Sequence, residues 1–321
     1  MIKFAFVGLQ HGHVATIYKK LSEHPDCEIA GVYDSVYDEN FGIKVTHKDL
    51  HSMIADVKPD VLVIGDVYGK RGQLVIEGLK ANLNIISDKP LCTSLAELDE
   101  IEKLVKEKNA VVGCMLDLRE NTNVYAAKKY IQQGIIGKVR SIQFGGQHPL
   151  NFGTRPAWYF EKGMHGGTIN DIAIHALDIC EFMLEDEIKS LDFAESWNTF
   201  REVPYFQDGS RLAFTMNNGC RCMGEVSYFA PDANGFNNPW YWRFTIWGEK
   251  GTMEFNYCTP GITFASKTEI GLQHFDGMDN EWTDLTSFLA ELDGKNPPLN
   301  TRQVLKISRK CLEFQQKSFN K

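Results

Sequence analysis

The chain has 321 residues, of which 43% are hydrophobic, 24% charged and 12% aromatic. This is the composition of a globular protein, and the length exceeds that of most single cores, which indicates two domains. The formal net charge is -8, so the chain offers no positive field for a nucleic-acid backbone or an anionic membrane surface. We therefore expect neither nucleic acid nor a membrane as a partner.

Eight cysteines are scattered along the chain, mostly within apolar runs and without a Cys-x-x-Cys pair. A thiol in such a run behaves as a small core hydrophobe. The apolar stretch at the start is too short for a signal peptide, and no segment approaches the roughly 20 apolar residues of a membrane span. These features favour a reducing, cytoplasmic location.

The first third of the chain alternates short β-branched apolar runs with helical patterns, which is typical of βαβ units and a parallel sheet. The expected strands span residues 2–8, 27–34, 60–65, 83–88 and 109–116. The expected helices span 13–23, 47–56, 71–81 and 94–108. The last of these opens with Ser94 and has Glu97 three residues later, which is the spacing of a capping box.

After residue 118 the pattern changes. We expect a helix at 121–133, a strand at 138–146, a long irregular loop at 147–167 and a helix at about 168–184. Such a loop inside a compact chain is typical of a functional segment. Strand-like runs at 191–200, 210–217, 220–229, 240–249 and 251–257 follow, joined by turn residues as in an antiparallel sheet. Helices at 281–292 and 301–318 complete the chain.

The predicted architecture is therefore α/β followed by α+β. Residues 1–119 form a doubly wound parallel Rossmann domain for NAD(P). Residues 120–321 form a substrate-binding and oligomerisation domain on an open-faced, mostly antiparallel sheet, with the C-terminal helix able to pack back on the first domain. Alternation places Trp240 and Trp242 on one face of this sheet, where they cover it or meet another subunit, and it gives Cys220 and Cys222 a packing role.

The first predicted strand runs directly into Gly8-Leu9-Gln10-His11-Gly12-His13 and then a helix. Glycines at this point let backbone N–H groups at a helix N-terminus approach a pyrophosphate. The match to G-x-G-x-x-G is imperfect, because Gln10 and His13 stand at the second and third glycine positions. A glycine-containing turn of another doubly wound protein is the alternative.

Asp34 ends the second predicted strand, 26 residues after Gly8. An acidic side chain there accepts the ribose hydroxyls of the adenosine half and repels a 2′-phosphate, which favours NAD over NADP. The alternative is that Asp34 only caps the end of the strand.

Two further motifs carry a resemblance to a known family. Ser87-Asp88-Lys89-Pro90-Leu91 follows the strand at 83–88, and the run from Gly166-Gly167 to Asp171 and His175 lies in the second domain. With the N-terminal βαβ unit, they resemble the Gfo/Idh/MocA oxidoreductases, named for glucose-fructose oxidoreductase and inositol dehydrogenase. The family's Glu-Lys-Pro signature appears here as Asp-Lys-Pro. The resemblance implies that Lys89, Asp171 and His175 form the catalytic trio.

The chemistry also follows from the residue types. Oxidation of a secondary alcohol releases a hydroxyl proton, which needs a base that is neutral near pH 7, and His175 suits that role. Asp171 lies four residues earlier on the same helical face and can orient the imidazole, while Lys89 can polarise the reacting oxygen. Singly, each has an ordinary structural explanation. Further metal ligands would have to come from His148 or His165 at no recognised spacing, so we expect no metal.

The chain also departs from the family. Where the family usually shows T-P-N-x-x-H, this sequence has Asp66-Val67-Tyr68-Gly69-Lys70-Arg71. We expect the middle of the cofactor to be supported by Lys70 or Arg71 on the diphosphate or by a helix N-terminus. The expected cofactor contacts are Gly8, Gln10, His11, Gly12, His13, Asp34, Asp66, Lys70, Arg71, Asp88, Lys89 and Pro90.

The long loop supplies polar and aromatic side chains that suit a polyhydroxylated ligand. Ordinary loop packing is the alternative for its aromatic residues. The expected substrate contacts are Lys89, His148, Asn151, Arg155, Trp158, Tyr159, Asp171 and His175.

We therefore expect an NAD(P)-dependent dehydrogenase that transfers a hydride between the nicotinamide and a secondary alcohol of a sugar, inositol or related polyol. Two alternatives stay open. One is a redox-neutral enzyme that uses NAD for glycoside cleavage through a keto intermediate, and the other is a non-catalytic, cofactor-sensing regulator on the same fold. The open sheet face predicts a homodimer or homotetramer.

Overall fold

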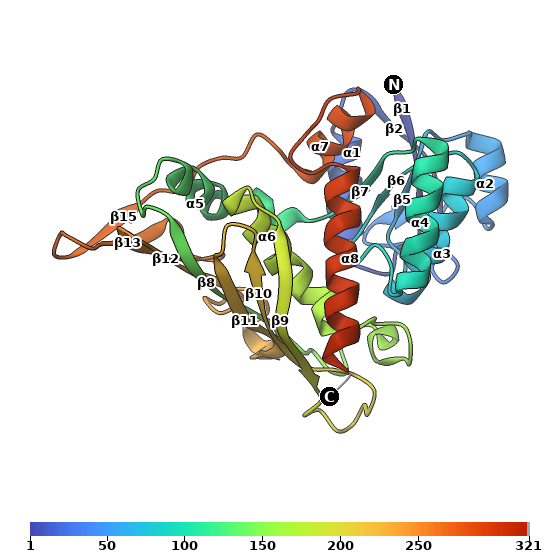
Figure 1. Ribbon diagram of the computed structural model, residues 1–321. Coiled ribbons are helices and arrows are strands. Elements are labelled where there is room, and N and C mark those ends of the chain that lie inside the picture. The colour runs from blue at the N-terminus through green and yellow to red at the C-terminus, as the bar shows by residue number, and fades with distance from the viewer. Residues whose placement is uncertain (320–321) are drawn as a thin grey trace. The chain divides into compact units, whose positions relative to one another are not determined.

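The computed structural model describes residues 1–319, which pack into two compact units (Figure 1). Unit 1 contains Met1–Leu116, Pro156–Gly166 and Asp284–Arg309. Unit 2 contains Asp117–Arg155, Gly167–Thr283 and the chain from Lys310 onward. The first unit thus takes in two segments that the sequence-based division at residues 119 and 120 assigns to the second domain.

Unit 1 is built on a five-stranded, wholly parallel sheet of order β2-β1-β5-β6-β7, as the sequence predicts. Its strands are β1 Ile2–Val7, β2 Cys27–Tyr33, β5 Val61–Ile64, β6 Asn84–Ser87 and β7 Val112–Cys114. Since β1 lies between β2 and β5, the chain reverses direction across the sheet after β2. The carboxyl ends of strands beside such a reversal are where open α/β sheets bind ligands.

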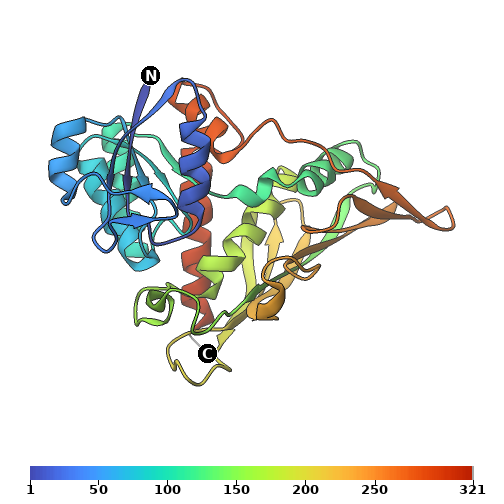
Figure 2. The same cartoon turned by 180° about the vertical axis from the view of Figure 1, so that it is seen from behind.

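Helices cover both faces of this sheet (Figures 1 and 2). They are α1 His13–Ser22, α2 Leu50–Val57, α3 Tyr68–Lys80, α4 Leu95–Lys108 and α7 Asp284–Leu292. On one face, Val14 and Ile17 of α1 join Phe288 of α7 in a core with Phe4 and Phe6 of β1. On the other face, α3 packs so closely that a Cβ at Gly78 would lie 2.6 Å from Ile85. The small ribbon of β3 Glu39–Asn40 and β4 Ile43–Lys44 was not expected.

Unit 2 is built on an eight-stranded sheet of order β15-β14-β13-β12-β8-β11-β10-β9, in which β8 and β11 pair in parallel and the other described pairs of this sheet are antiparallel. Its strands are β8 Val139–Pro149, β9 Ile188–Trp197, β10 Gly209–Met216, β11 Arg221–Ala230, β12 Trp242–Gly248, β13 Gly251–Asn256, β14 Ile262–Ser266 and β15 Leu272–Phe275. The prediction of a mostly antiparallel sheet is confirmed. The sequence patterns do not identify β15, whose side chains are mostly exposed.

Helices α5 Thr122–Gln132 and α6 Ile174–Leu184 belong to unit 2, whereas α8 Thr301–Ser318 passes from unit 1 into unit 2. A π-helical turn, Ile169–Ala173, leads directly into α6. Every residue of α6 from Ile174 to Met183 is buried, so this helix is a core element with no solvent face. No helix within residues 1–319 has the length and apolar character needed to cross a membrane.

The predicted pairing of Trp240 and Trp242 on one sheet face is wrong. Strand β12 begins only at Trp242, because Asn238 closes a turn in which its side-chain oxygen accepts the N–H of Trp240. Trp240 is therefore 54% exposed, while Trp242 is buried. Cys220 and Cys222 are both buried, which confirms their packing role.

The capping box predicted at the start of α4 is present. The Ser94 hydroxyl accepts the N–H of Glu97, and the Glu97 carboxylate accepts the N–H of Ser94. We expect Ser94→Ala to lower the free energy of unfolding by about 1 kcal/mol, because it leaves a first-turn N–H without its partner. Urea denaturation measures this, with Ser22→Ala at the end of α1 as the exposed control. Equal stability of the two variants would contradict the capping role.

Candidate functional site

The glycine turn after β1 is shaped by a close backbone approach. Gly8 has φ +81, and a Cβ there would lie 2.5 Å from the Cα of Asp66, so only glycine fits. The N–H of Gly8 donates to the carbonyl of Tyr33 over 2.8 Å. Gly12 is the N-cap of α1 and has open space around it. The turn thus places a helix N-terminus, with its unsatisfied N–H groups, where an anion can approach.

Asp34 caps the end of β2, which is one of the two roles that the sequence left open, and its contact with the ribose stays a prediction. Its carboxylate accepts the N–H groups of Val36 and Tyr37, as a cap at the end of β2 does. The same carboxylate accepts the N–H of Leu9 and the side-chain amide of Gln10. Gln10, at the second glycine position of the motif, therefore ties the turn to the end of β2.

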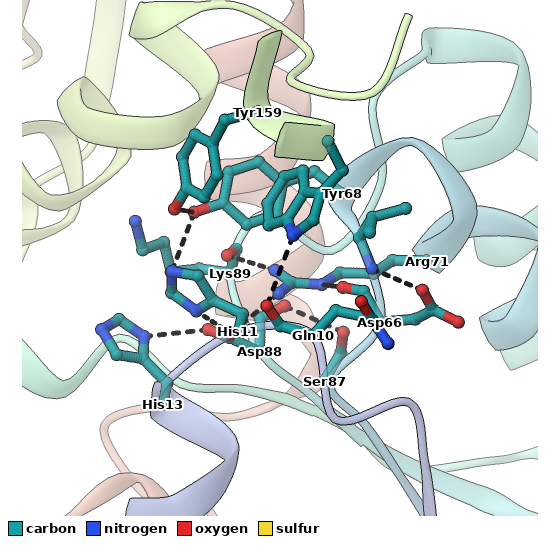
Figure 3. Close-up of polar contacts among 12 residues, drawn as sticks. Gln10, His11, His13, Asp66, Tyr68, Arg71, Ser87, Asp88, Lys89 and Tyr159 are labelled. Atoms are coloured by element: carbon teal, nitrogen blue, oxygen red, sulfur yellow. Dashed lines mark hydrogen bonds and ion pairs between the residues drawn. The ribbon is translucent and has the colours of Figure 1, made fainter. Parts of the chain in front are cut away.

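Asp88, directly after β6, is the centre of a buried polar cluster (Figure 3). Its carboxylate pairs with Arg71 at 2.8 Å, with Nδ1 of His11 at 2.5 Å and with Nδ1 of His13 at 2.9 Å. Burial acts to raise the pKa of this carboxyl, but Arg71 and the two histidines outweigh it and hold the pKa well below its usual value. Asp88 is therefore ionised near pH 7.

Arg71 is a buried positioning residue. It has no exposed surface, its Nε donates to the carbonyl of Asp66 over 2.7 Å, and its Nη1 donates to the carbonyl of Lys89. The expectation that Arg71 contacts a diphosphate is therefore corrected, because its guanidinium is used inside the unit. Lys70, its exposed neighbour, keeps that possibility.

Arg71 fixes the backbone of Lys89. The Lys89 side chain is 3% exposed, and its Nζ lies 5.8 Å from the centre of the Tyr68 ring, within cation–π range. Pro90 follows and is buried as well. Asp66 is also buried, and burial raises the pKa of its carboxyl although the Val67 N–H donates to it.

His11 links Asp88 to two tyrosines. Its Nε2 lies 3.1 Å from the hydroxyl of Tyr68, which lies 2.7 Å from the hydroxyl of Tyr159. Burial lowers the pKa of His11 to about 4, and its proximity to Asp88 offsets this only in part. His11 is therefore neutral near pH 7. With Nδ1–H donating to Asp88, Nε2 accepts the Tyr68 hydroxyl proton, and the Tyr68 oxygen is left to accept from Tyr159.

Trp158 and Tyr159, expected at the substrate, lie in unit 1 on the segment Pro156–Gly166, called the strap below. The Trp158 indole N–H donates to the carbonyl of Gln10 over 3.4 Å. The rings of Trp158 and Tyr159 stack at 4.0 Å. Both side chains therefore lie against the glycine turn. No sequence motif identified Tyr68, because it lies in the segment 66–71, where this chain departs from the family's T-P-N-x-x-H pattern.

In unit 2, Asp171 lies in the π-helical turn and His175 in the first turn of α6, both buried. The Asp171 carboxylate accepts the hydroxyl of Tyr228 from β11. The ring of His175 lies edge-on to Trp242, with 6.0 Å between ring centres. Sequence reasoning missed Tyr228, because alternation in a strand indicates only that it is buried.

The remaining predicted substrate residues of unit 2 adjoin this group. The ring centre of His148 lies 6.1 Å from that of Tyr228 and 5.1 Å from that of Tyr241. The guanidinium of Arg155 lies 5.4 Å from the ring centre of Tyr228 and donates to two carbonyls of its own loop. Asn151 donates its backbone N–H to Asp232. Arg155 and Asn151 therefore shape the loop beside Tyr228.

His11, His13 and Asp88 each offer a ligand atom within 4.8 Å of the others, a set that suits a divalent metal. Sequence reasoning considered other histidines and overlooked this cluster. The carboxylate is also bonded to the Arg71 cation, and each histidine Nδ1 lies within hydrogen-bond distance of it. We therefore describe the cluster as a hydrogen-bond network.

The neutral state of His11 predicts a pH dependence of stability. Between pH 6.5 and about 4 the unfolded chain binds a proton at His11 that the folded chain does not. Stability therefore falls as the pH drops through this window, by up to about 3 kcal/mol for this group. Urea denaturation at pH 4.5 to 7.5 should show a shallower dependence in His11→Asn than in the wild type. The exposed His51→Asn serves as the control, and an unchanged slope in His11→Asn would refute the assignment.

Two family models match the chain. Residues 2–115 match the oxidoreductase family, NAD-binding Rossmann fold, and residues 124–254 match the GFO/IDH/MocA C-terminal domain. Among curated proteins, the chain is 28% identical to levoglucosan dehydrogenase of Pseudarthrobacter phenanthrenivorans, over 68% of this chain and 60% of that enzyme. It is 23% identical to myo-inositol 2-dehydrogenase of Thermotoga maritima, over 78% of this chain and 74% of that enzyme.

The fold is also that of solved structures. An inositol dehydrogenase homologue from Azotobacter vinelandii, complexed with NAD+, superposes with a TM-score of 0.79 at 15% identity, covering 99% of this chain and 95% of that chain. One family model covers the parallel sheet, and the other covers the mostly antiparallel sheet from β8 into β13. The chain therefore belongs to the Gfo/Idh/MocA oxidoreductase family, and its N-terminal part is the family's NAD-binding Rossmann domain.

Proposed function

We propose that this protein is an NAD-dependent dehydrogenase that oxidises a secondary alcohol group of a sugar, inositol or related polyol. The observation that carries the proposal is the buried pair of Asp171 and His175, retained in a chain whose other unit anchors Lys89 at the end of β6. This pair supports a catalytic protein over a sensor of the cofactor. The levoglucosan and inositol dehydrogenases among the relatives support the substrate class.

The residues of unit 1 fit a dinucleotide. Gly8 allows the tight turn after β1, because a Cβ there would collide with Asp66, and the turn leads to Gly12 and the N-terminus of α1, where a pyrophosphate can approach backbone N–H groups. Asp34 follows β2, and we propose that its carboxylate, which accepts N–H groups of the glycine turn and of its own segment, also accepts the ribose hydroxyls. NAD, when bound, supplies the hydride acceptor.

The chain's own side chains handle the proton. We assign His175 as the base that takes the hydroxyl proton, because imidazole ionises near pH 7. Asp171 orients His175 or a substrate hydroxyl, and Tyr228 holds the Asp171 carboxylate in place. Lys89 polarises the reacting oxygen with its ammonium group. His148, beside Tyr228, is proposed to contact the polyol.

The assembly and the compartment are part of the proposal. We propose a homodimer or homotetramer that covers the outer face of the large sheet, where Met223 is 43% exposed. The cysteines, most of them buried, suit a reducing compartment, and we propose a cytoplasmic location.

Loss of the proposed base or of the polarising lysine should stop turnover. We expect His175→Ala and Lys89→Ala to lower kcat by about 10²- to 10⁴-fold, because each removes a proton-transfer or charge-stabilising group. A screen of polyols and sugar acids with NAD, followed by absorbance of NADH, provides the assay. Lys80→Ala, at the exposed end of α3, is the control. Full activity in either variant would refute the trio, and bound NAD with no net NADH would favour the redox-neutral alternative.

The charge of Asp34 should set the choice of cofactor. We expect Asp34→Asn to shift the ratio of NADP to NAD affinity by roughly tenfold toward NADP, because it removes a negative charge from beside the 2′-phosphate. Fluorescence titration with NADH and NADPH measures the ratio. Asp38→Asn, an exposed change on the same segment, should leave it unaltered. An unchanged ratio in Asp34→Asn would remove Asp34 from cofactor selection.

A further inference from the structure

The strap Pro156–Gly166 is attached to the start of α3 by an apolar cluster of its own. Val67 and Tyr68 pack with Trp158 and Tyr159, and Met164 packs against them from the side. This cluster is separate from the core of the parallel sheet. The strap therefore has its own docking surface on the nucleotide unit.

Gly69 makes close docking possible. Its N–H donates to the carbonyl of Met164 over 2.8 Å. A Cβ at this position would lie 2.5 Å from the backbone oxygen of Gly163 and 3.0 Å from the Cα of Met164. Backbone atoms cannot move aside as a flexible side chain can, so any larger residue at position 69 would displace the strap.

The second attachment is polar and directional. Neutral His11 accepts from Tyr68, and Tyr68 accepts from Tyr159 on the strap (Figure 3). The chain of hydrogen bonds continues from His11 to Asp88, and Asp88 forms an ion pair with Arg71. The groups that face His11 are thus Asp88 after β6, His13 on α1, and Tyr68 and Arg71 on α3. The hydroxyl pair is buried, so water does not compete for it.

The strap docks beside the turn that approaches the cofactor. Trp158 donates to the carbonyl of Gln10, in the middle of the Gly8–His13 turn, and the turn continues into α1. A dinucleotide whose diphosphate lies at this helix N-terminus lies next to the docked strap.

We propose that Gly69, Tyr68 and Tyr159 are positioning residues that hold the strap over the glycine turn, so that opening of the strap governs release of the dinucleotide. This inference rests on the proposed cofactor function. It concerns the dissociation of the cofactor, which is a separate step from hydride transfer and which sets how long the protein keeps its cofactor between turnovers.

Cofactor release tests the proposal directly. The full-length protein is loaded with NADH and mixed with excess NAD+ in a stopped-flow instrument, and the loss of bound NADH fluorescence gives the release rate. We expect Gly69→Ala to accelerate release at least tenfold. Tyr159→Phe should accelerate it about fivefold, because it removes one buried hydrogen bond. Gly145→Ala, where a Cβ meets open space on β8, is the matched control and should not change the rate.

Amide hydrogen exchange of residues 157–164 gives a readout that does not depend on activity. NADH should slow exchange of the strap in the wild type and in Gly145→Ala, and this protection should be lost in Gly69→Ala. If Gly69→Ala does not fold, Tyr159→Phe and Tyr68→Phe carry the same test. One result would overturn the proposal: amide exchange of the strap is faster in these variants, yet their NADH release rates stay within twofold of the control.

The outcomes separate this inference from the proposed function. If no polyol is oxidised but the variants release NADH faster, the dehydrogenase assignment fails and the strap proposal stands. If a polyol is oxidised and the variants release NADH at the control rate, the dehydrogenase assignment stands and the strap proposal fails. Metal analysis of the purified protein adds an independent check. An ion on Nδ1 of His11 would stop its donation to Asp88, an ion on Nε2 would stop its acceptance from Tyr68, and either would overturn the directional chain.

Discussion

A single buried carboxylate organises the nucleotide unit. Asp88 has no exposed surface, and an ion removed from water is stable only when charged and hydrogen-bonding partners replace the water. Those partners are His11 of the glycine turn, His13 at the start of α1 and Arg71 of α3. The end of β6 is thereby fixed to the starts of two helices, and the glycine turn and Lys89 take their places from this one arrangement.

Unit 2 follows the same physical rule. Helix α6 is buried on all sides from Ile174 to Met183, and the buried Asp178 on it is paired with Arg119. Seven residues earlier in the chain, Asp171 accepts the hydroxyl of Tyr228, and Asp171 precedes His175 by four residues. In both units a carboxylate held by fixed donors lies within a few residues, along the chain, of the proposed reactive residue. Such pre-organisation lowers the cost of placing a catalytic group.

The corrections share one cause. Arg71 is a basic residue in a variant motif, and nothing local distinguishes an arginine on the surface from one enclosed by Asp66, Asp88 and Lys89. Trp158 and Tyr159 have the composition of a sugar platform, yet they pack on Tyr68, which lies about ninety positions earlier in the chain. These contacts join segments far apart in sequence, and periodicity carries no information about such pairs.

The sequence by itself determined the parallel sheet, the capping box at Ser94 and the motifs around Gly8, Asp88 and His175. Each of these features depends on a local pattern of a few residues: the length of an apolar run, the period of a helix or a glycine at a tight turn. Only the tertiary structure decided that His11 is neutral, that Gly69 must lack a side chain and that the strap lies on the nucleotide unit. Burial and backbone approach between distant segments set these properties, and they exist only once the chain has folded.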